Sequence, residues 1–182
     1  MSKHHLTGRR IAVFGGSAPR PGEPAYEEAL TLGKLLGSAG CTVLNGGYIG
    51  TMEAVSRGAA EAGGHVIGVT CDEIECWRPV KPNRWIHEEW RYPTLRQRLL
   101  AMIDACEGAI ALPGGVGTLT EIAMTWNLLL TEAIPSKPLV LVGPGWKEVI
   151  LQFFAQMDGQ VPENQRKWVA FAPDVHAALA LL

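Results

Sequence analysis

Residues 109–121 read AIALPGGVGTLTE, and this stretch decides the fold. Its first residues, Ala109–Leu112, form a short apolar run typical of a buried strand. Pro113, Gly114 and Gly115 interrupt that run, and apolar residues then recur at helical spacing over Leu119–Leu130. A strand that passes through a glycine turn into a helix is the repeating unit of a parallel α/β sheet.

The same alternation of strand and helix extends along the chain in both directions. Apolar runs rich in β-branched residues predict further strands over Ile11–Phe14, Thr42–Leu44, His65–Val69, Leu139–Val142 and Trp168–Phe171. Helical spacing predicts further helices over Tyr26–Leu36, Met52–Ala62, Leu95–Ala105 and Val149–Phe154. We therefore expect residues 1–182 to form a single-domain α/β fold: a Rossmann-like parallel sheet with helices on both faces.

The segment Cys71–Arg91 departs from this alternation. It contains three tryptophans, two prolines and mixed charges without a clear period. We expect an irregular excursion over the sheet edge, with one short strand near Trp85–Glu88. A lid, a dimer contact and a plain surface loop all fit its composition.

Glycine turns follow three of the predicted strands. Because the carboxyl ends of parallel strands share one edge of a sheet, turns at these positions can converge on one ligand. Glycine permits positive φ and close approach, and a helix N-terminus favours a phosphate. The turns are Gly15-Gly16-Ser17, Gly46-Gly47 with Gly50, and Gly114-Gly115 with Gly117. Neither GxxxxGK[ST] nor a GxGxxG motif is present, which disfavours a P-loop kinase and a dinucleotide dehydrogenase.

Composition favours a small anionic ligand. The net charge of −2, from 16 basic and 18 acidic residues, does not predict binding to nucleic acid or to a membrane surface. The four cysteines have no CxxC spacing, and no apolar signal segment follows Met1, so we expect a reduced, cytoplasmic protein. Cys71 and Cys76, with His65 and His87, match no common zinc spacing, so no metal site is expected.

Residues 113–121 match the pattern PGGxGTxxE, and the chain resembles the LOG family of cytokinin-activating phosphoribohydrolases. The resemblance extends to the Gly-Ser turn, to a GGxxGxM turn at residues 46–52, and to Trp126 followed by Lys137-Pro138. It implies cleavage of the N-glycosidic bond of an adenine-type nucleoside 5'-monophosphate, such as AMP or an N6-substituted AMP. It also implies a homodimer that needs no cofactor.

The resemblance also assigns candidate site residues. Arg98 and Glu121 match the family's functional pair, and Arg96 is the competing arginine, on a different face of the same helix. The chain departs from better-known members at Leu99, Asn45 and Glu53, which bears on the substrate's identity. The candidate substrate-binding residues are Gly15, Ser17, Gly46, Gly47, Gly50, Thr51, Met52, Gly114, Gly115, Val116, Gly117 and Thr118.

Several alternatives remain open from the residues alone. Thr118 and Glu121 have the spacing of a capping box, in which the glutamate bonds back to the helix start. Arg98 fits an ordinary surface arginine, and Trp126 fits core packing better than base stacking. At the level of function, a carrier of a phosphorylated ligand, similar to molybdenum-cofactor carriers, would use the same glycine turns without Arg98 and Glu121. A lysine decarboxylase would need a pyridoxal lysine, and none falls in these turns.

Overall fold

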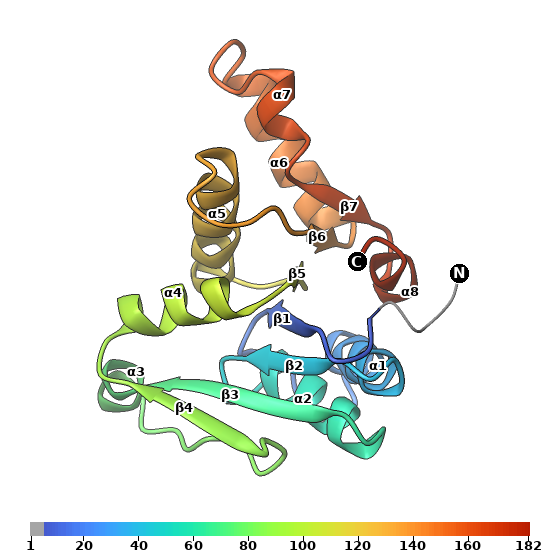
Figure 1. Cartoon of the computed structure of the whole chain (residues 1–182), viewed down its shortest axis with the longest axis vertical. Helices are drawn as coiled ribbons and strands as arrows, with labels where there is room; N and C mark the ends of the chain where they lie inside the picture. Colours follow the sequence, from blue (N-terminus) through green and yellow to red (C-terminus); the bar gives the residue numbers. More distant parts are fainter. Residues whose placement is uncertain (1–5) are drawn as a thin grey trace.

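Over residues 6–182, seven parallel strands form one sheet in the order β4-β3-β2-β1-β5-β6-β7 (Figure 1). The computed structural model describes residues 6–182. The strands are β1 (Arg10–Phe14), β2 (Thr42–Asn45), β3 (His65–Cys71), β4 (Glu88–Tyr92), β5 (Gly108–Ala111), β6 (Leu139–Val142) and β7 (Ala170–Ala172). The helices are α1 (Pro24–Ser38), α2 (Thr51–Glu61), α3 (Asp72–Trp77), α4 (Leu95–Ala105), α5 (Val116–Leu130), α6 (Pro144–Gln156), α7 (Glu163–Arg166) and α8 (Val175–Leu179).

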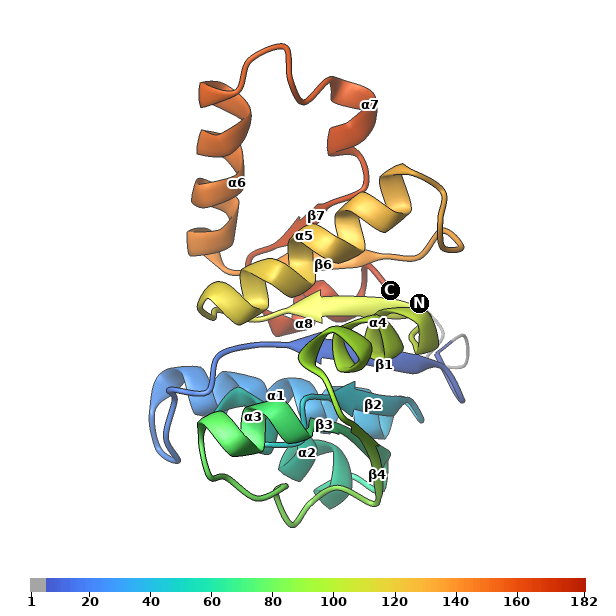
Figure 2. The same cartoon turned by 90° about the vertical axis from the view of Figure 1, so that its left-hand side faces the viewer.

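Helices cover both faces of the sheet, as the alternation of elements predicts. Successive side chains of a strand point to opposite faces, so each strand contributes to two cores. In β5 and the residue after it, Ile110 and Leu112 pack with α1, α2 and α8, while Ala109 and Ala111 pack with α4 and α5. Figure 2 shows α4 and α5 together in front of the strands. The Rossmann-like fold expected from the sequence is confirmed.

The order of the strands reverses beside β1. The chain runs outward from β1 through β2 and β3 to β4, and α4 then leads back to β5, on the other side of β1. Register pairs Ala12 with Leu44 on one side of β1 and with Ala109 on the other. The carboxyl ends of β1, β2 and β5 therefore lie next to one another, at the position where open α/β sheets bind ligands.

The segment Cys71–Arg91 is more regular than its sequence suggests. It holds the short helix α3, and its strand is β4 at Glu88–Tyr92 instead of Trp85–Glu88. The strand was misplaced because β4 is an edge strand with the sequence EEWRY, which has no apolar run, although it pairs in parallel with β3. No residue of α3 is buried, so this helix has no apolar period to detect.

Other predicted boundaries also differ from the structure, most of them by one to three residues. The last strand is Ala170–Ala172, not Trp168–Phe171, because the backbone joins β6 from residue 170 onward. The helix predicted at Val149–Phe154 begins at Pro144, since proline at the first helical position starts a helix although it reads as a turn residue. α2 spans Thr51–Glu61 and so begins and ends one residue before the predicted Met52–Ala62. Within residues 6–182, no helix has the length and apolar character needed to cross a membrane.

Candidate active site

The three glycine turns are joined by hydrogen bonds centred on Gly16. The Gly16 amide donates to the Pro113 carbonyl at 3.2 Å, which links the turn after β1 to the turn after β5. The Gly16 carbonyl accepts from the Thr51 amide at 3.0 Å and from Thr51 Oγ1 at 2.9 Å, which links it to the turn after β2. The sequence prediction that these turns converge is borne out by this geometry.

Close contacts explain why glycine occupies several of these positions. A β-carbon on Gly15 would collide with Thr51 Oγ1, and one on Gly114 would collide with the Thr118 side chain. At Gly50, where φ is +74°, a β-carbon would lie 2.6 Å from both the Gly16 carbonyl oxygen and Ser17 Cα. Neighbouring turns are therefore in close contact at Gly15, Gly50 and Thr51.

The turn after β2 is shaped by the side chain of Asn45. Asn45 Oδ1 accepts from the Gly47 amide at 2.8 Å, and Asn45 Nδ2 donates to Ser56 Oγ at 2.8 Å. Gly46 lies against the side chains of Met52 and Arg98, so that any β-carbon there would collide with the guanidinium group. The close contact with Gly46 restricts the position of the Arg98 guanidinium group.

The N-terminus of α5 faces open space. Apart from the chain neighbours and the backbone of α5 itself, a β-carbon at Gly115 or Gly117 would have no atom within 4 Å. The amides of Val116, Gly117 and Thr118 make no hydrogen bond to any residue in 6–182. Val116 is 81% exposed, whereas the Thr118 side chain is buried under Gly114. These amides and the helix dipole form a surface suited to an anion.

Arg98 is buried at this edge, with 6% of its surface exposed. It projects from α4, and its Nε donates to the Val69 carbonyl at 2.7 Å. Its Nη1 lies 3.7 Å from Glu121 Oε1. The alternative of an ordinary surface arginine is therefore wrong for Arg98. Arg96, the competing residue, is exposed.

Glu121 follows the open N-terminus of α5 by one helical turn, and only 13% of its side chain is exposed. Burial raises its pKa to about 7, although the nearby Arg98 guanidinium acts to lower it. The capping-box alternative is wrong, because α5 begins at Val116 with Gly115 as its N-cap and no side-chain cap. A buried carboxylate beside a buried guanidinium can stabilise positive charge on a bound ligand.

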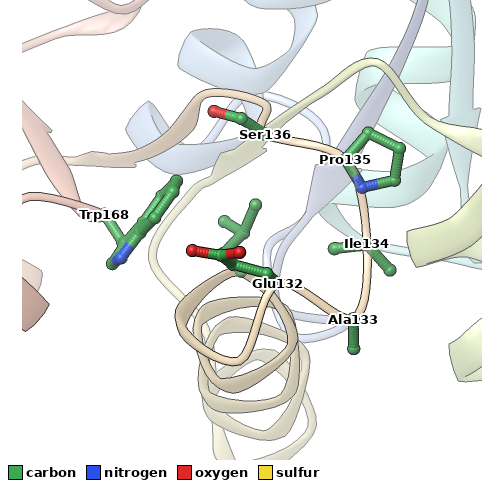
Figure 3. A pocket seen from close by; sticks show the side chains of 7 residues that line it. Glu132, Ala133, Ile134, Pro135, Ser136 and Trp168 are labelled. Atoms are coloured by element: carbon green, nitrogen blue, oxygen red, sulfur yellow. The ribbon is translucent and has the colours of Figure 1, made fainter.

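Two features away from this edge take no part in the arrangement. Trp126 packs against Phe154 with ring centroids 5.7 Å apart and donates to the Gln165 carbonyl at 2.9 Å, which agrees with a packing role. Figure 3 shows a separate pocket beside the C-terminal end of α5, at the far end of that helix from the glycine turn. Its lining residues are Leu129, Glu132, Ala133, Ile134, Pro135, Ser136 and Trp168.

The structure brings two further residues to the site that the sequence analysis did not select. Arg78 Nη1 donates to Ser17 Oγ at 3.0 Å, and Asn83 Nδ2 donates to the Gly47 and Tyr48 carbonyls, each at 3.0 Å. Both come from the segment between Cys71 and Arg91, and no motif surrounds them. Only the tertiary fold reveals that this segment borders the first and second glycine turns.

The sheet order and the linked turns define an α/β protein of the Rossmann-like class, with its candidate site where the strand order reverses beside β1. A family model described as "Possible lysine decarboxylase" matches residues 52–182. A probable cytokinin riboside 5'-monophosphate phosphoribohydrolase of Oryza sativa subsp. japonica is 34% identical over 96% of this chain and 71% of its own length. A cytokinin riboside 5'-monophosphate phosphoribohydrolase of Arabidopsis thaliana is 31% identical over 96% of this chain and 82% of its own length. The chain belongs to the LOG family.

A solved structure from a differently named group has a similar fold. The molybdenum cofactor carrier protein of Chlamydomonas reinhardtii superposes with a TM-score of 0.71 at 25% identity, over 95% of this chain and 94% of that one. The words "lysine decarboxylase" in the description of the family model do not point to a reactive lysine of this chain. Lys137, which is buried, lies just before β6 at the opposite edge of the sheet, and its Nζ donates to the Ile103 and Cys106 carbonyls.

Proposed function

We propose that this chain hydrolyses the N-glycosidic bond of an adenine-type nucleoside 5'-monophosphate, AMP or an N6-substituted AMP, to free base and ribose 5-phosphate. The observation that carries the proposal is the buried pair of Arg98 and Glu121, one helical turn from the open N-terminus of α5. The named activity of the rice and Arabidopsis relatives supports the same reaction.

The phosphate binds first in this scheme. The amides of Val116, Gly117 and Thr118 donate to the 5'-phosphate at the positive end of the α5 dipole. Because Gly115 and Gly117 carry no side chain and face open space, the phosphate can approach the backbone closely. The ribose then extends along α5 toward Glu121.

Bond cleavage follows from the charge of Glu121. As the bond between C1' and the base nitrogen lengthens, positive charge develops on the ribose ring, and a carboxylate in a poorly solvated place stabilises it strongly. Water adds its oxygen to C1' and loses a proton, the bond electrons leave with the base, and the base gains a proton, so that the net reaction moves one proton from water to the base. Arg98 holds the carboxylate and favours its ionised form, since its own Nε is fixed on the Val69 carbonyl.

A non-catalytic carrier of a phosphorylated ligand is the second candidate. The similarity to the Chlamydomonas carrier favours it, and the glycine turns serve both functions. The two differ in what they require of Glu121, because a carrier needs the phosphate-binding amides and no buried carboxylate near the sugar. Release of free base separates them.

The test is a chromatographic assay of base release from a panel of nucleoside monophosphates, with Glu121→Gln beside the unmodified chain. Glutamine keeps the size of the side chain and removes its charge, so we expect kcat for AMP to fall about 1000-fold while AMP still binds. Glu148→Gln, at an exposed position of α6, serves as the control and should keep full activity. Tight AMP binding without base release by the unmodified chain would favour the carrier.

A further inference from the structure

Arg78 is a cation at the candidate site without a matching anion. Its Nε is buried and has no hydrogen-bond partner within residues 6–182. No carboxylate of those residues lies within 4.0 Å of its guanidinium group. A buried donor without an acceptor destabilises a folded protein, and more strongly when it is charged, so its presence calls for an explanation.

The neighbouring arginine in the same segment is different. Arg91 forms ion pairs with Asp72 at 2.7 Å and with Glu75 at 3.0 Å. The segment thus contains acids that could neutralise a guanidinium group, and they bind Arg91 instead. Arg78 has no ion pair within residues 6–182, and its guanidinium carbon lies over the Trp77 ring, 5.6 Å from the centroid.

Arg78 points at the first glycine turn. Its Nη1 donates to Ser17 Oγ at 3.0 Å, and Ser17 follows Gly16, whose amide is bound to the Pro113 carbonyl. A β-carbon on Gly16 would lie 3.3 Å from Gly114 Cα, so the first turn is in contact with the turn that leads into α5. The guanidinium group therefore lies on the side of the site where the phosphate-binding amides begin.

Arg78 is also held in place before any ligand binds. Its backbone amide donates to the Ile74 carbonyl at 2.8 Å, at the end of α3. α3 is tied to the second turn through Glu75, which accepts from Tyr48, and to α4 through Glu73, which accepts from the Leu95 amide at 2.8 Å. A fixed donor loses little entropy when a ligand binds.

We infer that Arg78 is a further ligand of the substrate's 5'-phosphate and selects nucleotides over nucleosides, an inference that rests on the proposed function. Its Nε and Nη2 donate to oxygens of the same phosphate that the α5 amides bind. A planar guanidinium group with two parallel donors suits a phosphate, and the phosphate supplies the anion that Nε lacks. The uncharged base and ribose hydroxyls offer no such partner.

The experiment measures AMP and adenosine hydrolysis, and ribose 5-phosphate binding by calorimetry, for Arg78→Gln and Arg78→Lys. We expect KM for AMP and Kd for ribose 5-phosphate to rise about 30-fold in Arg78→Gln, with kcat little changed. The kcat/KM for adenosine should stay the same, because adenosine has no phosphate. Arg78→Lys should recover part of the loss, since it restores the charge without the paired donors.

Arg84→Gln is the matched control, since it removes one positive charge from the same segment at an exposed residue whose guanidinium stacks on Trp85. It should change neither constant. Unchanged ribose 5-phosphate binding in Arg78→Gln, or an equal loss for AMP and adenosine, would overturn the assignment, as would an equal loss in Arg84→Gln. Failure of the unmodified chain to bind ribose 5-phosphate or AMP would overturn it too. Binding without base release by the unmodified chain would contradict only the proposed hydrolysis.

Discussion

At the scale of single residues, the protonation of Glu121 governs the proposed chemistry. Burial raises its pKa to about 7 from an ordinary value of 4.5. A raised pKa means that the carboxylate predominates only above about pH 7, and that the neutral acid predominates below it. The charge that stabilises the ribose cation is therefore lost as the pH falls.

We expect kcat/KM for AMP to rise with pH between about 5.5 and 8, with a midpoint near 7 in the free protein. The measurement is a steady-state pH profile, in buffers of constant ionic strength. In Glu121→Gln the residual kcat/KM should not rise with pH in this way. A profile that is flat across the range would show that Glu121 does not act as the ionised group.

Arg98 makes two contacts that lysine cannot make together. Its Nε binds the Val69 carbonyl while its Nη1 lies 3.7 Å from Glu121 Oε1. We expect Arg98→Lys to lower kcat/KM for AMP about 100-fold, because one ammonium group cannot span both partners. Arg96→Lys, an exposed change on the same helix, should have no effect on the rate. Equal rates for the two variants would assign Arg98 a merely structural role.

At the scale of elements, the turns depend on glycine in different ways. Gly50 and Gly63 both have positive φ, +74° and +79°, but only Gly50 is in close contact with another turn. We expect Gly63→Ala to lower the free energy of unfolding by about 1 kcal/mol, through backbone strain alone. Gly50→Ala should cost about 3 kcal/mol more, because its β-carbon meets the backbone of Gly16 and Ser17.

Urea denaturation of the two glycine variants measures this difference. The slope of free energy against urea should match that of the unmodified chain in both, so that midpoints report stability alone. Equal losses for Gly50→Ala and Gly63→Ala would mean that the linked turns adjust to an added side chain without strain.

The sequence predicts the central elements well and the edge poorly, for a physical reason. β1, β2, β5 and β6 are buried on both faces, so their apolar runs identify them directly. β4 lies at the edge, where Glu88 and Glu89 are exposed and parallel pairing with β3 holds the strand. Backbone pairing of this kind requires no particular pattern of side chains, so the sequence does not predict it.

The same distinction applies to the candidate site. The glycine turns and the Arg98 and Glu121 pair were found from local motifs and from the family resemblance. The contact between Arg78 and Ser17 joins residues 61 positions apart, and the burial of Arg98 depends on the packing of α4 against β3. Neither this contact nor the burial of Arg98 can be predicted from the spacing of residues within one helix or strand.

At the scale of the whole molecule, the strands β1 to β7 share one sheet, and β1 forms hydrogen-bonded ladders with β2 on one side and β5 on the other. We therefore expect one cooperative unfolding transition. Trp90 lies at the β4 edge and Trp146 on the β6 side, so two variants that each keep only one of these tryptophans, with phenylalanine at the other five tryptophan positions, report on the two sides separately by fluorescence. In each variant, fluorescence and circular dichroism should give the same urea midpoint. Separate transitions would divide the chain into two folding units.

The hydrogen bonds of Gly16 also connect the two helical layers. Its carbonyl holds the start of α2, which packs on one face of the sheet, and its amide holds the loop before α5, which packs on the other. We therefore expect an anion bound at the amino end of α5 to restrain α2 as well, through the two peptide groups of Gly16 and without contacting α2 itself.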